Sequence, residues 1–172
     1  VQTCALPISG GAKDSKEAFR WFQAAADKGN AAAQRELGGM YYDGDGVAKD
    51  LGQAASWYRK AAEQGEPVAQ TLYALLLLDG KAVPKNDAEA ARWTKASADQ
   101  GYPPAQMLMA GLYRQGIGVP RDIVHAYVYM SLAVMGKEPK AAAAKKDIAQ
   151  EMTREQIKEG DALAKAWRPT AQ

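Results

Sequence analysis

Acidic residues alternate with glycines over residues 43–46, which read Asp-Gly-Asp-Gly and could begin a calcium-binding loop. In such a loop a glycine stands at position six, and oxygen ligands stand at positions one and twelve. With Gly46 at position six, Tyr41 and Gly52 take positions one and twelve, and neither supplies a carboxylate. A dinucleotide-binding loop would follow a strand, and no strand is predicted before this glycine pair. We therefore interpret the segment as a turn, and we predict neither a metal site nor a cofactor.

His125 is the only histidine, and its position offers no catalytic partner. Nucleophilic catalysis by serine or cysteine needs a base within hydrogen-bond reach, and a zinc site needs further ligands. No serine, cysteine or second histidine is placed to meet either need. Ser15 and Lys16 are adjacent, so they do not form the Ser-x-x-Lys motif of β-lactamase-type hydrolases. The chain is therefore predicted not to be an enzyme.

The charge balance and the apolar stretches of the 172-residue chain argue against two kinds of partner. Its 22 basic and 20 acidic residues leave a net charge of +2, without the clustered basic face that phosphate binding requires. The longest apolar stretch, residues 72–78, is much shorter than the roughly 20 residues of a membrane-spanning helix. We predict no nucleic-acid partner and no membrane insertion.

The first nine residues differ in kind from the rest of the chain. Residues 1–8 read Val-Gln-Thr-Cys-Ala-Leu-Pro-Ile, which matches the translation of a sequencing adapter, and they contain the only cysteine, Cys4. We interpret 1–9 as a non-native segment that has no part in the fold, with a genuine N-terminal tail as the alternative. A signal peptide would lie upstream, so an exported, periplasmic location and a cytoplasmic one both stay open.

The rest of the sequence repeats with a period of 36 residues. Trp21, Trp57 and Trp93 are each 36 residues apart, and Tyr129 occupies the next position. The same step joins further sets, which are Gly29, Gly65 and Gly101; Ala33, Ala69 and Ala105; Gln34, Gln70 and Gln106; and Ala18, Ala54, Ala90 and Ala126. No insertion interrupts this register, so the sequence predicts stacked copies of one structural unit.

Each period predicts two helices. The first covers about 33–42, where Leu37 and Tyr41 share one face. The second follows Asp50, an N-cap residue, and Gly65 ends it. Its inward positions have helical spacing and are Ala54, Trp57, Tyr58, Ala61 and Ala62. We expect the small residues to let paired helices approach closely, and the aromatic residues to fill the space between hairpins.

These residues resemble the Sel-one-like repeat (SLR) family, which is related to the tetratricopeptide repeats. The family pattern is matched without a gap by Ala33, Leu37, Gly38, Tyr41, Gly44, Gly46, Val47, Asp50, Ala54, Trp57, Tyr58, Ala61, Ala62 and Gly65. The later repeats depart from it in places, for instance with Ala82 instead of the second loop glycine. The resemblance implies an all-α fold, a right-handed α/α superhelix with one concave face. It covers 10–136 as half a repeat followed by three repeats.

The segment after the repeats, 137–172, is expected to form C-terminal capping helices. One helix is predicted over 140–152, and Thr153 with Gln156 predicts a capping box that opens the last helix. Its predicted inward residues are Ile157, Leu163, Ala164 and Trp167. A polar outer face on such helices keeps a solenoid soluble.

The repeat array begins in the middle of a repeat, so its first helix lacks a hairpin partner. Trp21 and Phe22 lie on the apolar face of this helix. We expect both side chains to be exposed and to drive association of the chain.

One face of the first helix in each repeat is left for binding. Positions opposite the core vary between repeats, whereas the inward positions do not, and this favours a recognition surface. We predict that the concave surface contains Arg35, Tyr42, Thr71, Leu75, Leu78, Met107 and Arg114; the same positions also hold Gly39, Asp43, Asp79, Gly111 and Gln115. The three apolar side chains would form a patch between the two arginines. The alternative is that all of these are merely exposed helix positions.

The predicted function is that of a scaffold or adaptor that binds a protein or peptide on the concave face, as the resemblance implies. One alternative is a non-catalytic regulatory segment of a larger envelope or signalling protein. Another is a β-lactamase-like hydrolase, because some cysteine-rich SLR proteins are assigned that activity. Those relatives have paired cysteines in each repeat, and this chain has a single cysteine.

Overall fold

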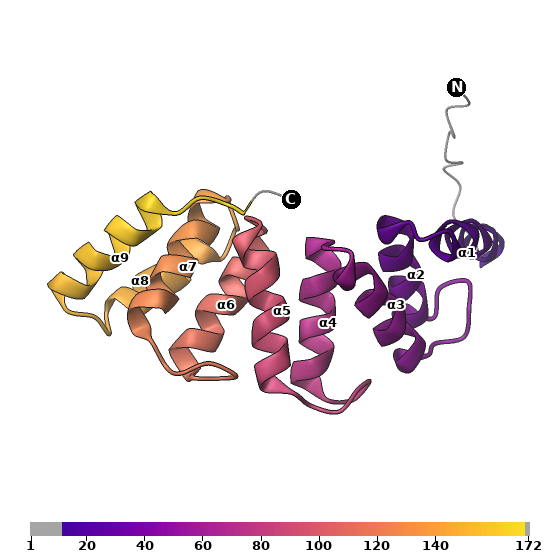
Figure 1. Ribbon diagram of the computed structural model, residues 1–172, viewed down its shortest axis with the longest axis horizontal. Coiled ribbons are helices and arrows are strands. Elements are labelled where there is room, and N and C mark those ends of the chain that lie inside the picture. The colour runs from indigo at the N-terminus through magenta and orange to yellow at the C-terminus, as the bar shows by residue number, and fades with distance from the viewer. Residues whose placement is uncertain (1–11, 171–172) are drawn as a thin grey trace, which may run out of the picture.

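The computed structural model describes residues 12–170, and all regular secondary structure within them is α-helix. The helices are α1 (Ala12–Asp27), α2 (Ala31–Asp43), α3 (Leu51–Glu63), α4 (Pro67–Asp79), α5 (Asp87–Asp99), α6 (Pro103–Gln115), α7 (Ile123–Met135), α8 (Ala141–Ala149) and α9 (Arg154–Ala166). They follow one another along a curved row from α1 to α9 (Figure 1). The predicted all-α solenoid is confirmed. Segment 1–9 lies outside the described residues, so its non-native origin stays a prediction.

Neighbouring helices in the sequence are neighbours in space. From α1 to α7 each helix packs against the next, and α7 also packs against both α8 and α9. We call α2, α4 and α6 the A helices, because each is the first helix of a repeat, and α3, α5 and α7 the B helices. The first helix, α1, occupies a B-helix position in the register.

Short polar motifs set the ends of these helices. The B helices begin at Asp50, Asn86 and Asp122, whose side chains each accept a hydrogen bond from a backbone N–H of the first turn. The A helices end where Gly44, Gly80 and Gly116 adopt the left-handed conformation. Only glycine adopts that conformation without a Cβ penalty, and this explains its recurrence in each loop.

Helix α2 begins two residues earlier than predicted, at Ala31 instead of residue 33. Asn30 is the reason, because its side-chain oxygen accepts from the backbone N–H of Ala33 at 2.8 Å and caps the helix there. Pro67 and Pro103 take the equivalent first positions in α4 and α6, where a missing N–H costs no hydrogen bond.

Two expectations for the C-terminal helices need correction. Helix α8 ends at Ala149 and does not reach residue 152. Thr153 must be extended to cap α9, and its hydroxyl and Gln156 form the predicted capping box. Leu163 is exposed instead of facing inward, because α9 meets α7 along the line that contains Gly160 and Ala164.

Buried glutamines connect successive hairpins. The glutamine column of the repeat, whose role the sequence did not reveal, consists of Gln34, Gln70 and Gln106. Each side-chain amide donates to a backbone carbonyl eight residues earlier, at the end of the preceding B-position helix, at 3.1–3.3 Å. Gln64 and Gln100 donate in turn to the first two glutamines, at 2.7 and 2.9 Å. These bonds satisfy polar groups that would otherwise be costly to bury.

Side-chain size is matched where an A helix crosses its own B helix. A Cβ atom on Gly38 would lie 2.6 Å from Cδ1 of Tyr58, so the ring of Tyr58 rests on the bare backbone of α2. In the next two repeats the equivalent buried pairs are Ala74 with Thr94 and Ala110 with Met130. Alanine is thus tolerated where the partner is not an aromatic ring.

We expect the two adjacent glycines of α2 to respond oppositely to alanine. Gly38→Ala forces a Cβ into the Tyr58 ring and should lower the free energy of unfolding by about 1–3 kcal/mol. Gly39→Ala is the matched control, because its Cβ would make only an ordinary 3.6 Å contact with the Tyr58 hydroxyl. It should raise the free energy of unfolding by about 0.5–1 kcal/mol through helix propensity. Urea unfolding followed by circular dichroism measures both, and equal effects would contradict the packing account.

Candidate functional site

The predicted site residues fall into two rows across the A helices. Residues at equivalent repeat positions lie at the same level of their helices. The row near the helix N-termini contains Arg35, Thr71 and Met107, and the row near the C-termini contains Tyr42, Leu78 and Arg114. Leu75 lies between the two rows on α4. The predicted set is therefore spread over three helices, and Leu78 and Met107 belong to different rows.

The N-terminal row is largely occupied by interactions within the protein. Arg35 contacts Glu36 at 2.7 Å and Glu66, at the start of α4, at 3.7 Å. Met107 is partly buried against the core formed by the last hairpins. Arg35 therefore links two repeats, and its charge is already balanced by carboxylates.

Thr71 lies inside the protein and not on the predicted surface. It is only 6% exposed, and its hydroxyl donates to the Pro67 carbonyl at 3.0 Å. The same hydroxyl lies 2.9 Å from the hydroxyl of buried Ser97 on α5. Position 71 thus joins α4 to α5, and its small polar side chain serves a buried hydrogen-bond cluster. The serine at position 97 is the signal in the sequence that could have suggested this pairing.

The C-terminal row is more open. Tyr42 is exposed, and the Lys49 ammonium lies 5.3 Å from the centre of its ring. Arg114 is half-exposed and pairs with Glu151, which follows α8 and also contacts Arg121 at 3.4 Å. A partner carboxylate at Arg114 would therefore compete with Glu151. Exposed pairs of this kind contribute little stability, about 0–1 kcal/mol, so such competition is not prohibitive.

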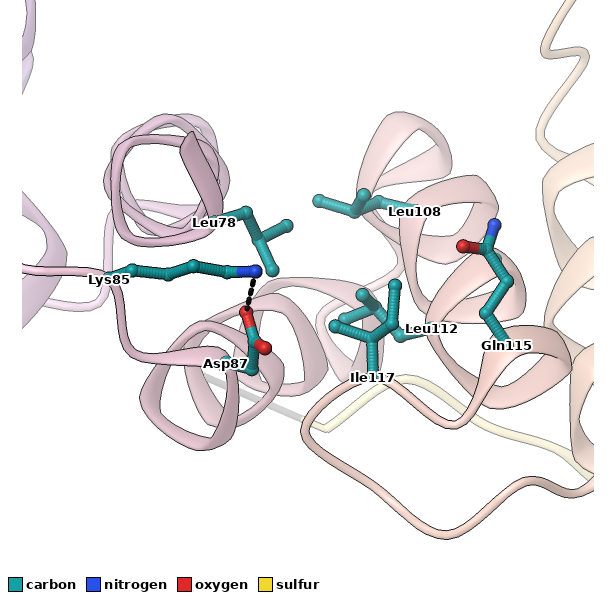
Figure 2. A pocket seen from close by; sticks show the side chains of 8 residues that line it. Leu78, Lys85, Asp87, Leu108, Leu112, Gln115 and Ile117 are labelled. Atoms are coloured by element: carbon teal, nitrogen blue, oxygen red, sulfur yellow. Dashed lines mark ion pairs between the residues drawn. The ribbon is translucent and has the colours of Figure 1, made fainter. Parts of the chain in front are cut away.

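A pocket of about 230 Å³ opens between α4 and α6 (Figure 2). Leu78 of α4 faces Leu108 of α6 across it, with Leu112 and Ile117 beside them. The remaining lining residues are Lys85, Asp87, Gly111 and Gln115. Lys85 and Asp87 form an ion pair at 3.5 Å along one edge. The pocket thus combines an apolar interior with a polar margin.

Sequence reasoning placed only Leu78, Gly111 and Gln115 of this pocket on the binding face. Leu108 and Leu112 lie on α6 outside the positions assigned to that face, and Ile117 belongs to the loop after it. They converge with Leu78 only when two hairpins stack, so a pattern within one repeat cannot reveal them. A signal was nevertheless present, because the position of Leu75 is held by Gly111 one repeat later.

Tyr58 and Asp122 are ionisable side chains whose pKa values are shifted by their surroundings. Burial, helped by the nearby negative charge of Asp43, raises the pKa of Tyr58 to about 12, so its hydroxyl stays protonated at neutral pH. Asp122 is partly desolvated, which alone would raise its pKa, but hydrogen bonds from the backbone and ring of His125 lower the pKa overall. Within residues 12–170 no three His, Cys, Asp or Glu side chains converge to hold a metal ion. None of the helices in this range is long and apolar enough to span a bilayer.

The open side of α1 is a second exposed region. Trp21 is 69% exposed, whereas Trp57, one repeat later, is 8% exposed because it packs against α2. Phe22 does not share this exposure, contrary to the prediction, because it packs against the cluster that includes Leu37. The exposed apolar feature of α1 is therefore Trp21, which borders a shallow hollow with Lys16 and Arg20.

The fold and its variable surface define a helical-repeat solenoid, in which side chains that differ between repeats are held on a constant stack of hairpins. The Sel1 repeat family model matches residues 9–30, 31–66, 67–102 and 103–136. The chain therefore belongs to the Sel1 repeat family.

Two solved structures are similar to the chain. The first is the crystal structure of c5321, a protective antigen present in uropathogenic Escherichia coli strains that displays an SLR fold. It has a TM-score of 0.83 and 30% sequence identity over 88% of this chain, which spans only 32% of that protein. The second is a Sel1 repeat protein from Oxalobacter formigenes, with a TM-score of 0.69 and 33% sequence identity. The matched region covers 74% of this chain and 96% of that protein. Comparison with curated proteins gives no significant match.

We expect the exposed Trp21 to drive self-association of this chain. Burying a tryptophan removes roughly 150–250 Å² of surface from water, enough to matter for a weak dimer. Trp21→Ser should weaken self-association at least tenfold in sedimentation velocity over a range of concentrations. Leu163→Ser on α9 is the matched control, since Leu163 is also an exposed large apolar residue. A wild-type chain that stays monomeric, or equal effects of both variants, would contradict the prediction.

Proposed function

We propose that the chain is a scaffold that binds a protein or peptide segment on its A-helix surface. This surface is defined by Arg35, Tyr42, Leu75, Leu78, Met107 and Arg114, and it is the side expected to be concave. Thr71 is left out because its side chain is buried. Membership of the Sel1 repeat family supports an interaction role in general.

One observation carries the proposal for this surface in particular. Leu75 and Tyr42 are each 42% exposed on A helices whose inward side chains are buried. Two large apolar side chains that stay in water contribute nothing to the stability of the unbound chain. Their exposure is favourable once a partner covers them, and aromatic and apolar side chains of this kind dominate the affinity of protein interfaces.

The charged groups around these side chains fit the same role. Arg35 and Arg114 are at opposite ends of the surface, and each is balanced by a glutamate of the chain itself. The charges therefore form a polar margin around an apolar centre, as in many protein interfaces. A balanced margin of this kind favours selectivity over long-range attraction of highly charged partners.

Peptides selected from a random displayed library on the immobilised protein provide the test. We expect Leu75→Glu to weaken the selected peptides at least tenfold, because it places an unpaired charge at the centre of the surface. Arg59→Ala is the control, since Arg59 is well exposed on the B helix α3, outside the A-helix surface. This variant should change the dissociation constant less than twofold in isothermal titration calorimetry.

Two results would overturn the proposal. One is a library that yields no peptide whose binding depends on Leu75 or Tyr42. The other is peptides that lose affinity with Arg59→Ala and keep it with Leu75→Glu. Hydrolysis of a β-lactam by the purified chain would show instead that the protein has a catalytic function.

A further inference from the structure

The pocket between α4 and α6 is lined at a repeat position that changes from leucine to glycine. Gly39, Leu75 and Gly111 occupy the same position in the three A helices. A Cβ atom built on Gly111 would meet nothing within 4 Å, so this side of α6 faces open space. The preceding repeat places the side chain of Leu75 at the equivalent point of α4. The third repeat therefore lacks a side chain that the second repeat supplies.

We propose that this pocket is an anchor site for one branched aliphatic side chain of the bound peptide, and that Gly111 determines its selectivity. The proposal rests on the function proposed above and specifies the chemistry of the partner. Leu75, at the equivalent position one repeat earlier, carries a side chain of this kind on the same surface. A leucine, isoleucine or valine of the partner would supply what Gly111 omits.

The size of the pocket favours a single side chain over a small-molecule ligand. Its volume of about 230 Å³ is below the roughly 300–1,000 Å³ of typical ligand sites. It is larger than the apolar cavity of about 150 Å³ that is known to admit a benzene molecule. One aliphatic side chain fits between these limits.

The lining determines the chemistry of the occupant. Leu78, Leu108 and Ile117 surround the interior and offer no side-chain hydrogen-bond group to a polar ligand. A polar side chain that entered would lose most of its hydrogen bonds to water, since Asp87 Oδ1, which is buried and accepts no hydrogen bond from the described residues, could replace only one of them. Lys85, Asp87 and Gln115 lie at the margin, where they can hydrogen-bond to the peptide backbone. An apolar centre with a polar margin is the usual arrangement around an interface hot spot.

One wall of the pocket is held in place by the neighbouring loop. Gly118, which follows Ile117, has a φ of +68° and lies so close to α5 that an added Cβ would be 2.0 Å from the carbonyl oxygen of Asp87. No other residue allows this approach, and it fixes the loop against the start of α5. The wall formed by Ile117 is therefore already in position, and a preformed pocket lowers the ordering cost of binding.

Substitutions at Gly111 test the proposal with peptides selected on the wild-type protein. We expect these peptides to share one aliphatic residue, and its replacement by asparagine to weaken binding at least tenfold. Gly111→Leu, which fills the pocket from inside, should also weaken binding at least tenfold, and Gly111→Ala should have a smaller effect. Ser56→Leu is the matched control, because it also adds a leucine at an exposed helix position but lies on the B helix α3, outside the A-helix surface, and it should change affinity less than twofold.

Stability measurements separate a filled pocket from a damaged fold. The Cβ at position 111 enters open space, and glycine is a poor helix former, so the thermal midpoint of Gly111→Leu should not fall. Leu108→Ala provides a second readout, because it widens the pocket. Peptides in which tryptophan, whose ring system is larger than benzene, replaces the aliphatic anchor should then bind this variant better, relative to the parent peptide, than they bind the wild type.

The outcomes distinguish the two proposals. If Leu75→Glu weakens the peptides and Gly111→Leu does not, the A-helix surface binds peptides but the pocket is not the anchor, and the inference is wrong. If no peptide binds the A-helix surface, both proposals fail. Loss of binding with Gly111→Leu and retained affinity with Ser56→Leu, together with the altered preference of Leu108→Ala, would support the anchor site.

Discussion

No hairpin of this protein can bury its apolar side chains without its neighbours, and this constraint determines most of what the chain shows. Leu78 of α4 packs against two buried clusters, one on each side of it. The bonds from the side-chain amides of Gln70 and Gln106 to the carbonyls of Ala62 and Ala98 join successive hairpins across such boundaries. Stacking therefore fixes both the apolar contacts and the buried polar groups. Stability in such an array comes from the interfaces between repeats as much as from the repeats themselves.

The same constraint leaves one surface free to vary. Positions that stack must keep their size, as Gly38 does beneath the ring of Tyr58. Positions on the A-helix surface make few of these contacts. The position of Leu75 can therefore hold glycine in the other two repeats without altering the A helices. A stack of similar hairpins thus presents a surface whose shape differs at each boundary. The pocket beside Gly111 is one result of that freedom.

The first and last described helices differ in how far their neighbours cover them. At the C-terminal end, α8 and α9 cover α7, and Thr170 beyond α9 bonds back to the carbonyl of Asp99 on α5 at 2.8 Å. Trp167 lies against Gly101 in the same region, so residues 167–170 connect the end of α9 to the second repeat. At the other end of the described residues, 12–170, the side chain of Trp21 is exposed. The equivalent Trp57 shows what a covering helix would bury.

The sequence by itself determined the repeat, its register, the two helices of each period and the residues that cap them. It could do so because N-cap side chains, left-handed glycines and helical spacing act within a few residues of one another.

The sequence did not determine which positions of the helix surfaces are available to a partner. Thr71 proved to be buried, since Ser97 lies against it across the hairpin, and Leu163 proved to be exposed, since Gly160 brings α9 onto α7 along a different line. The pocket, too, was decided only by the tertiary structure. Its walls come from α4, α6 and a loop that meet only when hairpins stack, and contacts between repeats leave no periodic signal within one repeat.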